Sequence, residues 1–275
     1  ADIDNQGDFE LRSNNQNNLV LDCLTLNCGS FFNRLNATLT FNDLQGLAIV
    51  GGSLTALNND GVVDLISGCG MIAPPGIDTG TYQFNSFCTL AFFTRPGTER
   101  VFEESVNLVS VGGTGLQLGG ALRVNGIAAR DFGYLIIDRD GRLFGPAPIT
   151  FTITTELRGR IEGSASETVT IAPGATLLTN SEPTDTPLLF GRTLVNNGGL
   201  DVRVRLLLED SAEIQNNGVL NLYGSPVFAG AIGCMPQPPC GLITNSSSGS
   251  IRSVSATGGP MTQLEGELSV VNEGT

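Results

Sequence analysis

Two neighbouring stretches decide the fold, Asn197-Gly198-Gly199-Leu200-Asp201-Val202 and Asn217-Gly218-Val219-Leu220-Asn221-Leu222. In each, an Asn-Gly turn leads into apolar residues at every second position, which is typical of a tight corner followed by a half-buried strand. Gly198 and Gly218 are 20 residues apart. That spacing matches one coil of a parallel β-helix, in which each coil places its short strands above those of the coil before.

The same unit occurs elsewhere in the chain, at Asn5–Leu11, Asn59–Leu65 and Asn272–Thr275. Asn and Gly tolerate the left-handed backbone of a tight corner, and stacked corners can align Asn side chains in hydrogen-bonded ladders. Alternation directs Leu, Val, Ile and Phe inward and polar residues outward. We therefore predict an all-β parallel β-helix, or β-solenoid, with disulfide-pinned loop insertions. A tandem β-sandwich is the alternative fold.

The repeat predicts one solenoid domain over residues 1–275. Residues 69–100 show no coil period, which predicts a lateral insertion, and residues 234–240 predict a smaller one. Residues 98–108 are the one stretch in which we expect a helix, because Thr98 can cap it. The sequence begins and ends within a coil-like unit, which favours a segment excised from a longer chain over a subunit that stacks end to end.

The chain has an even number of cysteines, and no Cys-x-x-Cys motif and no histidine accompany them. These features predict disulfides formed outside the cytoplasm rather than a zinc or redox site. Six cysteines allow 15 connectivities. Pairing between sequence neighbours is favoured among Cys23, Cys28, Cys69, Cys88, Cys234 and Cys240.

Composition excludes several functions. Without His, the usual serine and cysteine nucleophile arrangements are not available, and without Lys there is no Schiff base. A net charge of −13 with no basic cluster disfavours binding to nucleic acid and to anionic lipid. No apolar run approaches the roughly 20 residues that a membrane helix needs. We predict a non-enzymatic chain without catalytic residues, cofactor or membrane-spanning segment.

Three groups of residues remain as candidate sites. Phe84, Phe87, Phe92 and Phe93 are a candidate ligand-binding patch, with a satellite core under a loop as the alternative. Asn58, Asp60 and Asp64 resemble part of a calcium loop, although position 12 of such a loop falls on Ser67. Asp131, Asp138 and Asp140, with Arg nearby, are the carboxylates that a polysaccharide-degrading β-helix would use; solvated charges around an Asp-Gly turn are the alternative.

The Asn-x-Gly-apolar units, above all residues 196–222 and 264–275, resemble right-handed β-helical passenger regions of bacterial autotransporters and related surface adhesins. The resemblance implies an extracellular or cell-surface structural or adhesive protein without a catalytic residue set. Its partners would be a host or neighbouring cell surface, a glycan, or a second copy of itself. Six cysteines depart from these usually cysteine-poor regions. The alternatives are a self-assembling filament or sheath subunit, formed by end-to-end association, and the polysaccharide-degrading enzyme.

Overall fold

The computed structural model describes residues 2–13, 19–22, 28–85, 89–110, 115–179, 186–224, 231–233, 241–255, 263–264 and 268–275. Within these residues the secondary structure consists of strands and turns, with no helix. No helix suited to crossing a membrane is therefore found in the described ranges. Contacts divide the chain into two compact units, unit 1 over Ala1–Gly126 and unit 2 over Ile127–Thr275.

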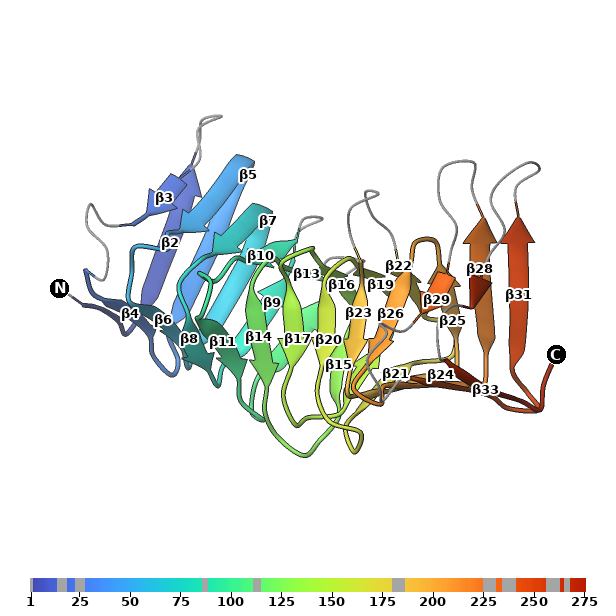
Figure 1. Ribbon diagram of the computed structural model, residues 1–275. Coiled ribbons are helices and arrows are strands. Elements are labelled where there is room, and N and C mark those ends of the chain that lie inside the picture. The colour runs from blue at the N-terminus through green and yellow to red at the C-terminus, as the bar shows by residue number, and fades with distance from the viewer. Residues whose placement is uncertain are drawn as a thin grey trace. The chain divides into compact units, whose positions relative to one another are not determined.

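Unit 1 is built from strands of two parallel sheets, A and B (Figure 1). The strands of sheet A are, in spatial order, β1 (Ile3–Asn5), β4 (Ser30–Asn33), β6 (Ala56–Asn59), β8 (Gly76–Asp78), β11 (Glu99–Phe102) and β14 (Ala121–Val124). The strands of sheet B are β2 (Asp8–Ser13), β3 (Leu19–Leu21), β5 (Thr38–Val50), β7 (Val62–Ile72), β9 (Thr81–Phe84), β10 (Leu90–Phe92), β12 (Asn107–Ser110) and β13 (Gly115–Leu118). The long strand β5 pairs with both β2 and β3, and β7 with both β9 and β10, so sheet B covers two sides of each coil.

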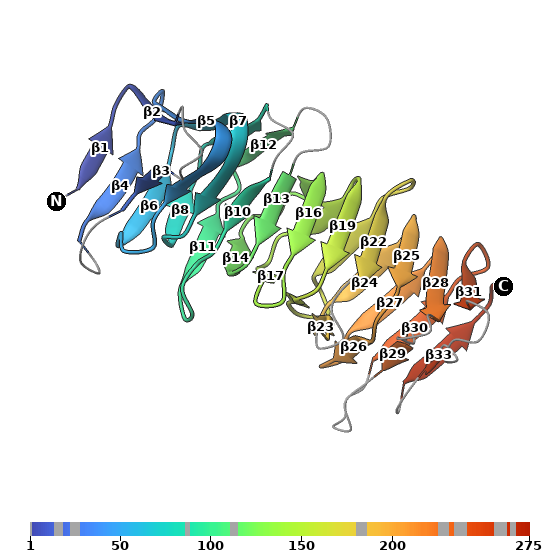
Figure 2. The same ribbon diagram turned by 90° about the horizontal axis from the view of Figure 1, so that it is seen from above.

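Unit 2 has three strands per coil, which along the chain belong to a third parallel sheet, C, then to sheet B and then to sheet A. Figure 2 shows β22, β25 and β28 of sheet B side by side. Its sheet C contains β15 (Arg130–Phe132), β18 (Ile149–Phe151), β21 (Thr168–Ile171), β24 (Thr193–Asn196), β27 (Glu213–Asn216), β30 (Leu242–Asn245) and β33 (Ser269–Asn272). Its part of sheet B contains β16 (Tyr134–Ile137), β19 (Thr154–Leu157), β22 (Thr176–Thr179), β25 (Gly199–Val202), β28 (Val219–Gly224) and β31 (Ser250–Ser255). Its part of sheet A contains β17 (Arg142–Phe144), β20 (Arg160–Glu162), β23 (Leu188–Phe190), β26 (Leu206–Glu209), β29 (Ala231–Gly233) and β32 (Gln263–Leu264).

The pairing confirms the predicted parallel β-solenoid. Strands at equivalent places in successive coils pair in parallel and in register, as Leu177 of β22 does with Leu200 of β25 and Leu200 with Leu220 of β28. A tandem β-sandwich is excluded, because sandwiches are built from antiparallel strands.

The core consists of inward-facing apolar rows along the stacked coils. Most short strands alternate between partly exposed and buried residues, as period-2 alternation requires. In unit 1 the rings of Tyr82, Phe92 and Phe102 meet with centroids 5.5 to 5.8 Å apart. Each coil buries this apolar row against its neighbours and not within itself, so stability builds up along the stack.

The corner glycines are required for a reason that differs from the predicted one. A Cβ on Gly61 would lie 2.3 Å from the Ala37 carbonyl oxygen, and one on Gly218 would lie 2.3 Å from the Gly198 carbonyl oxygen. Neither glycine has a positive φ. Glycine is therefore needed where one corner approaches the next, and not for left-handed backbone.

Two predictions about residues 69–108 are corrected. The described part of 69–100, expected to be an insertion, contains the end of β7 together with β8, β9, β10 and the start of β11, all paired within the sheets. The helix expected over 98–108 is wrong, because β11 and β12 occupy this stretch. Inward-facing Arg100 and Phe102 share a period of two, which fits a strand.

Candidate functional site

A ladder of amide side chains follows one corner of unit 1. Asn5, Asn33 and Asn59 occupy equivalent positions at the ends of β1, β4 and β6. Asn5 Nδ2 donates to Asn33 Oδ1 over 2.8 Å, and Asn33 Nδ2 donates to Asn59 Oδ1 over 2.7 Å. The next position of the ladder is Asp78, which pairs with Asn59 in the register of β6 and β8. A carboxylate thus replaces an amide at the position where this ladder ends.

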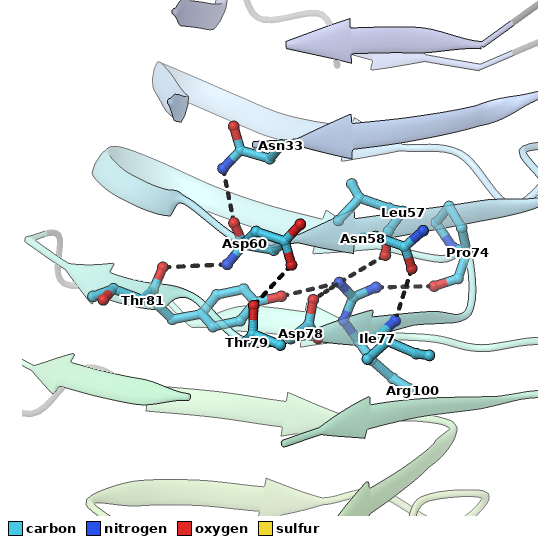
Figure 3. Close-up of polar contacts among 12 residues, drawn as sticks. Asn33, Leu57, Asn58, Asp60, Pro74, Ile77, Asp78, Thr79, Thr81 and Arg100 are labelled. Atoms are coloured by element: carbon cyan, nitrogen blue, oxygen red, sulfur yellow. Dashed lines mark hydrogen bonds and ion pairs between the residues drawn. The ribbon is translucent and has the colours of Figure 1, made fainter. Parts of the chain in front are cut away.

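Asp78 belongs to a fully buried polar cluster with Arg100 and Tyr82 (Figure 3). Arg100 Nη2 lies 2.6 Å from Asp78 Oδ1 and 3.0 Å from the Tyr82 hydroxyl oxygen. The guanidinium also donates to two carbonyl oxygens, those of Pro74 and Leu57, each over 3.2 Å. We call Asp78, Tyr82 and Arg100 the buried cluster.

Burial and mutual charge set the protonation of the buried cluster. Burial raises the pKa of Asp78 from its ordinary value of 3.8 to about 6, although the Arg100 guanidinium opposes this rise. Burial also raises the pKa of the Tyr82 hydroxyl. Burial by itself would lower the pKa of Arg100, but Asp78 and Tyr82 raise it, and the net direction is upward. The cluster therefore holds a permanent positive charge whose counter-ion titrates close to neutral pH.

The geometry makes the buried cluster a clamp between coils. Arg100 lies on β11, reaches Asp78 at the end of β8 and extends to the Leu57 carbonyl on β6. All three side chains are shielded from solvent, which leaves no surface for a substrate. The buried cluster therefore stabilises the contact between β11, β8 and β6.

Unit 2 contains a second buried arginine with a comparable reach. Arg192 Nη2 donates to the carbonyl oxygens of Gly145 over 2.7 Å and Ala147 over 2.9 Å, and its Nε lies 3.7 Å from Glu167 Oε2. Burial lowers the pKa of Arg192, and Glu167 opposes this shift. In each unit, one buried arginine therefore donates hydrogen bonds to carbonyl oxygens of coils that precede it.

Unit 2 also has its own amide ladder, formed by Asn196, Asn216, Asn245 and Asn272 at the ends of strands of sheet C. Each Nδ2 donates to the Oδ1 of the following member over 2.7 Å. The ladder predicted from the Asn-x-Gly corners is thus present in both units.

The candidate phenylalanine patch does not form as predicted. Phe84 and Phe92 are buried, with at most 2 % of each exposed, and belong to the core instead. Phe93 is 38 % exposed, and its ring covers Gly119, where a Cβ would meet it at 2.1 Å. Phe87 lies outside the described residues. Phe84 and Phe92 are buried because they occupy inward-facing positions of β9 and β10, in a stretch where the sequence predicted an insertion and not strands.

The three candidate calcium ligands lie on separate elements and each contacts the following coil. Asn58 Oδ1 accepts from the Ile77 backbone amide over 2.9 Å, and Asp60 Oδ1 accepts from the Thr79 hydroxyl over 2.7 Å (Figure 3). Asp64 Oδ1 accepts from Asn85 Nδ2 over 2.8 Å. Burial raises the pKa of Asp64. In the described part of the chain, no three His, Cys, Asp or Glu side chains gather closely enough to hold a metal ion.

The candidate catalytic carboxylates lie on different sheets. Asp131 is exposed on β15 of sheet C, whereas Asp138 follows β16 of sheet B and Asp140 is exposed in the turn after it. Asp138 Oδ1 lies 3.5 Å from Arg158 Nη1, and Arg158 Nη2 lies 2.8 Å from Glu156 Oε2. Asp138 thus joins an ion-pair network in place of a cleft shared with Asp131.

Cysteines are described at two positions only. Neither Cys28 nor Cys69 is a free thiol. Cys23, Cys88, Cys234 and Cys240 lie outside the described residues, as does the predicted insertion over 234–240. The predicted pairing stays a prediction.

Sequence reasoning missed the buried cluster, although two signals for it exist. Asp78-Thr79-Gly80 has the same Asp/Asn-x-Gly corner form as Asn59-Asp60-Gly61, one coil earlier. Arg100 shares its strand face with Phe102, which marks an inward position. An arginine at an inward position normally argues against the assigned strand alternation, because a buried charge is costly. Here it indicates a buried ion pair.

Fold and site together define a parallel β-solenoid whose buried polar groups bind coil to coil. No protein-family model matches the chain, and neither a curated protein nor a solved structure shows significant similarity to it. The resemblance to autotransporter passengers and adhesins is therefore not confirmed by a family match.

Proposed function

We propose that this chain is an extracellular or cell-surface, non-catalytic solenoid that serves as a structural or adhesive surface element. One observation carries the proposal: outward-facing charged and amide side chains bond from one coil to the next. Examples are Asn42 to Glu10 over 2.7 Å and Asn221 to Asp201 over 2.8 Å. Such groups reinforce the stack, as a structural protein requires.

Ion pairs follow the same arrangement. Arg123 Nε lies 3.0 Å from Glu99 Oε1 on the neighbouring strand of sheet A, and Arg34 Nε lies 2.6 Å from Asp4 Oδ1. Each exposed pair contributes about 0 to 1 kcal/mol by itself. Repeated along a stack, they resist slippage of one coil against the next.

An extracellular location also agrees with the proposed disulfides, which would pin loops to the coils. Mass spectrometry of a non-reduced digest tests this part. We expect three linked peptide pairs. Peptides that carry alkylated free cysteines would contradict it.

Binding and electron microscopy test the function. The purified chain, fluorescently labelled, is applied to cultured cells and to immobilised glycans, and the same preparation is imaged by negative staining. Saturable binding by discrete particles supports an adhesive element. Fibres that lengthen with protein concentration, without binding to cells or glycans, would replace it with the filament function. Release of sugars from a panel of polysaccharides would replace it with the enzyme.

A further inference from the structure

Three adjacent strands of unit 2 expose a mixed aromatic and charged surface on sheet A. Arg142 of β17 pairs in register with Arg160 of β20, and Glu162 of β20 pairs with Phe190 of β23. Phe144 ends β17, two residues after Arg142. We call Arg142, Phe144, Arg160, Glu162 and Phe190 the arginine face; Figure 1 shows β17, β20 and β23 in succession.

Alternation fixes the direction of these five side chains. Leu143, Ile161 and Leu189 lie between them in sequence and are at most 1 % exposed, so they point into the core. Their neighbours point to the opposite side of the sheet. The arginine face is therefore held by a packed sheet and requires no loop for its position.

Of the two arginines of the arginine face, Arg160 forms the longer ion pair and is exposed for contact with a ligand. Glu162 accepts from Arg142 Nε over 3.1 Å and from Arg142 Nη2 over 2.5 Å. Arg160 reaches the same carboxylate only at 4.0 Å, and its side chain is 57 % exposed. Arg142 and Arg160 thus lie on neighbouring strands, whose backbones are about 4.8 Å apart, and both reach the Glu162 carboxylate. Close like charges favour a further anion between them.

Aromatic rings flank these charges. The Arg142 guanidinium carbon lies 5.2 Å from the centre of the Phe144 ring, which restrains the side chain by a cation–π contact. Phe190, beside Glu162 in the register, is 37 % exposed. A ring in this position offers an apolar surface for the C–H groups of a sugar, while the arginine fork matches a carboxylate or sulfate.

We infer that the arginine face binds an anionic glycan, a polysaccharide with carboxylate or sulfate groups. The inference rests on the proposed adhesive function and names its ligand class. The glycan lies across β17, β20 and β23 with one acidic group at Arg160 and a sugar ring against Phe190. Because the chain is strongly acidic overall, binding depends on local charge and weakens as salt shortens the electrostatic range.

Affinity for immobilised polygalacturonate, heparin and neutral dextran tests the inference. The first two separate carboxylate from sulfate recognition. Arg160→Gln removes the exposed guanidinium, and we expect binding to at least one polyanion to weaken roughly tenfold or more, since a hydrogen bond to a charged group contributes about that factor. Phe190→Ala weakens it less.

Arg252→Gln is the matched control, since it removes an equally charged, exposed side chain from sheet B of the same unit. We expect its affinity to equal that of the wild type, and the circular dichroism of all variants to be unchanged. The inference is overturned if the chain binds dextran as well as it binds the polyanions, or if it binds neither polyanion. It is also overturned if Arg160→Gln and Arg252→Gln weaken binding equally. If Arg160→Gln binds cells as the wild type does, the arginine face is rejected as the binding site and the adhesive function remains. If the wild type binds neither cells nor glycans, the binding site and the adhesive function are both rejected.

Discussion

Replacing Arg100 by Met removes the charge at the centre of the buried cluster and keeps a side chain of similar length. Asp78 would then remain buried without a counter-ion, and the carbonyl oxygens of Leu57 and Pro74 would lose a donor. Removing one partner of a buried ion pair costs about 3 to 5 kcal/mol. We expect the free energy of unfolding to fall by about that amount at pH 7.5.

The destabilisation caused by Arg100→Met should also depend on pH. The pKa of Asp78 is about 6 with Arg100 in place, and removal of the guanidinium, which lowers this pKa, raises it further. Between pH 5 and pH 7.5 the folded variant therefore retains the Asp78 proton more than the folded wild type does, and its stability falls more steeply as pH rises. The cost of Arg100→Met should therefore be smaller at pH 5 than at pH 7.5. Combining it with Asp78→Asn should recover part of the loss at pH 7.5, because no buried carboxylate remains.

Urea unfolding followed by far-ultraviolet circular dichroism measures these differences, with limited proteolysis to detect local opening of unit 1. Arg123→Met is the control, because Arg123 of β14 forms an exposed pair with Glu99 of β11, the strand that also carries Arg100. Its removal should cost less than about 1 kcal/mol. The reasoning is refuted if Arg100→Met costs no more than Arg123→Met, or if its cost does not depend on pH.

Three further predictions concern the same polar groups. Asn216→Ala removes a ladder member with neighbours on both sides and should cost about 3 kcal/mol in chemical unfolding, whereas Asn217→Ala, at the exposed next position, should cost under about 1. The pKa of Asp78 is about 6 in the folded state and 3.8 in the unfolded state, so the free energy of unfolding should fall by about 3 kcal/mol as pH rises between these values. Asp78→Asn should abolish this fall. A variant with the same pH profile as the wild type would contradict the prediction. Because Asp60 and Asp64 already bind the following coil, adding a calcium chelator should leave the thermal midpoint unchanged, and a fall on chelation would restore the calcium hypothesis.

Local sequence predicted the coils wherever a corner carries Asn-x-Gly. Residues 196–222 follow the predicted alternation, and their corner asparagines form the predicted ladder. These features depend on neighbours in sequence, so a short window contains enough information. The prediction failed over residues 69–100, where Asp78-Thr79-Gly80 keeps the corner form but has an aspartate in place of the asparagine.

The buried cluster could not be found in this way because its members become favourable only together. Arg100 by itself belongs on the surface, and its burial depends on Asp78 and on carbonyl oxygens that arrive from two other coils. The exposed arginine face poses a different difficulty. Alternation places Arg142 and Arg160 outside, but only the register of β17 with β20 shows that they are neighbours.

The amide ladder of unit 2 has a direction. Every Nδ2 donates toward the C-terminal neighbour, from Asn196 through Asn216 to Asn245, so the side-chain dipoles are aligned. Aligned hydrogen bonds polarise one another, and an interior member gains from both sides. Sheet C thus contains a continuous row of aligned amides, and removal of a middle member weakens the hydrogen bonds that remain on either side.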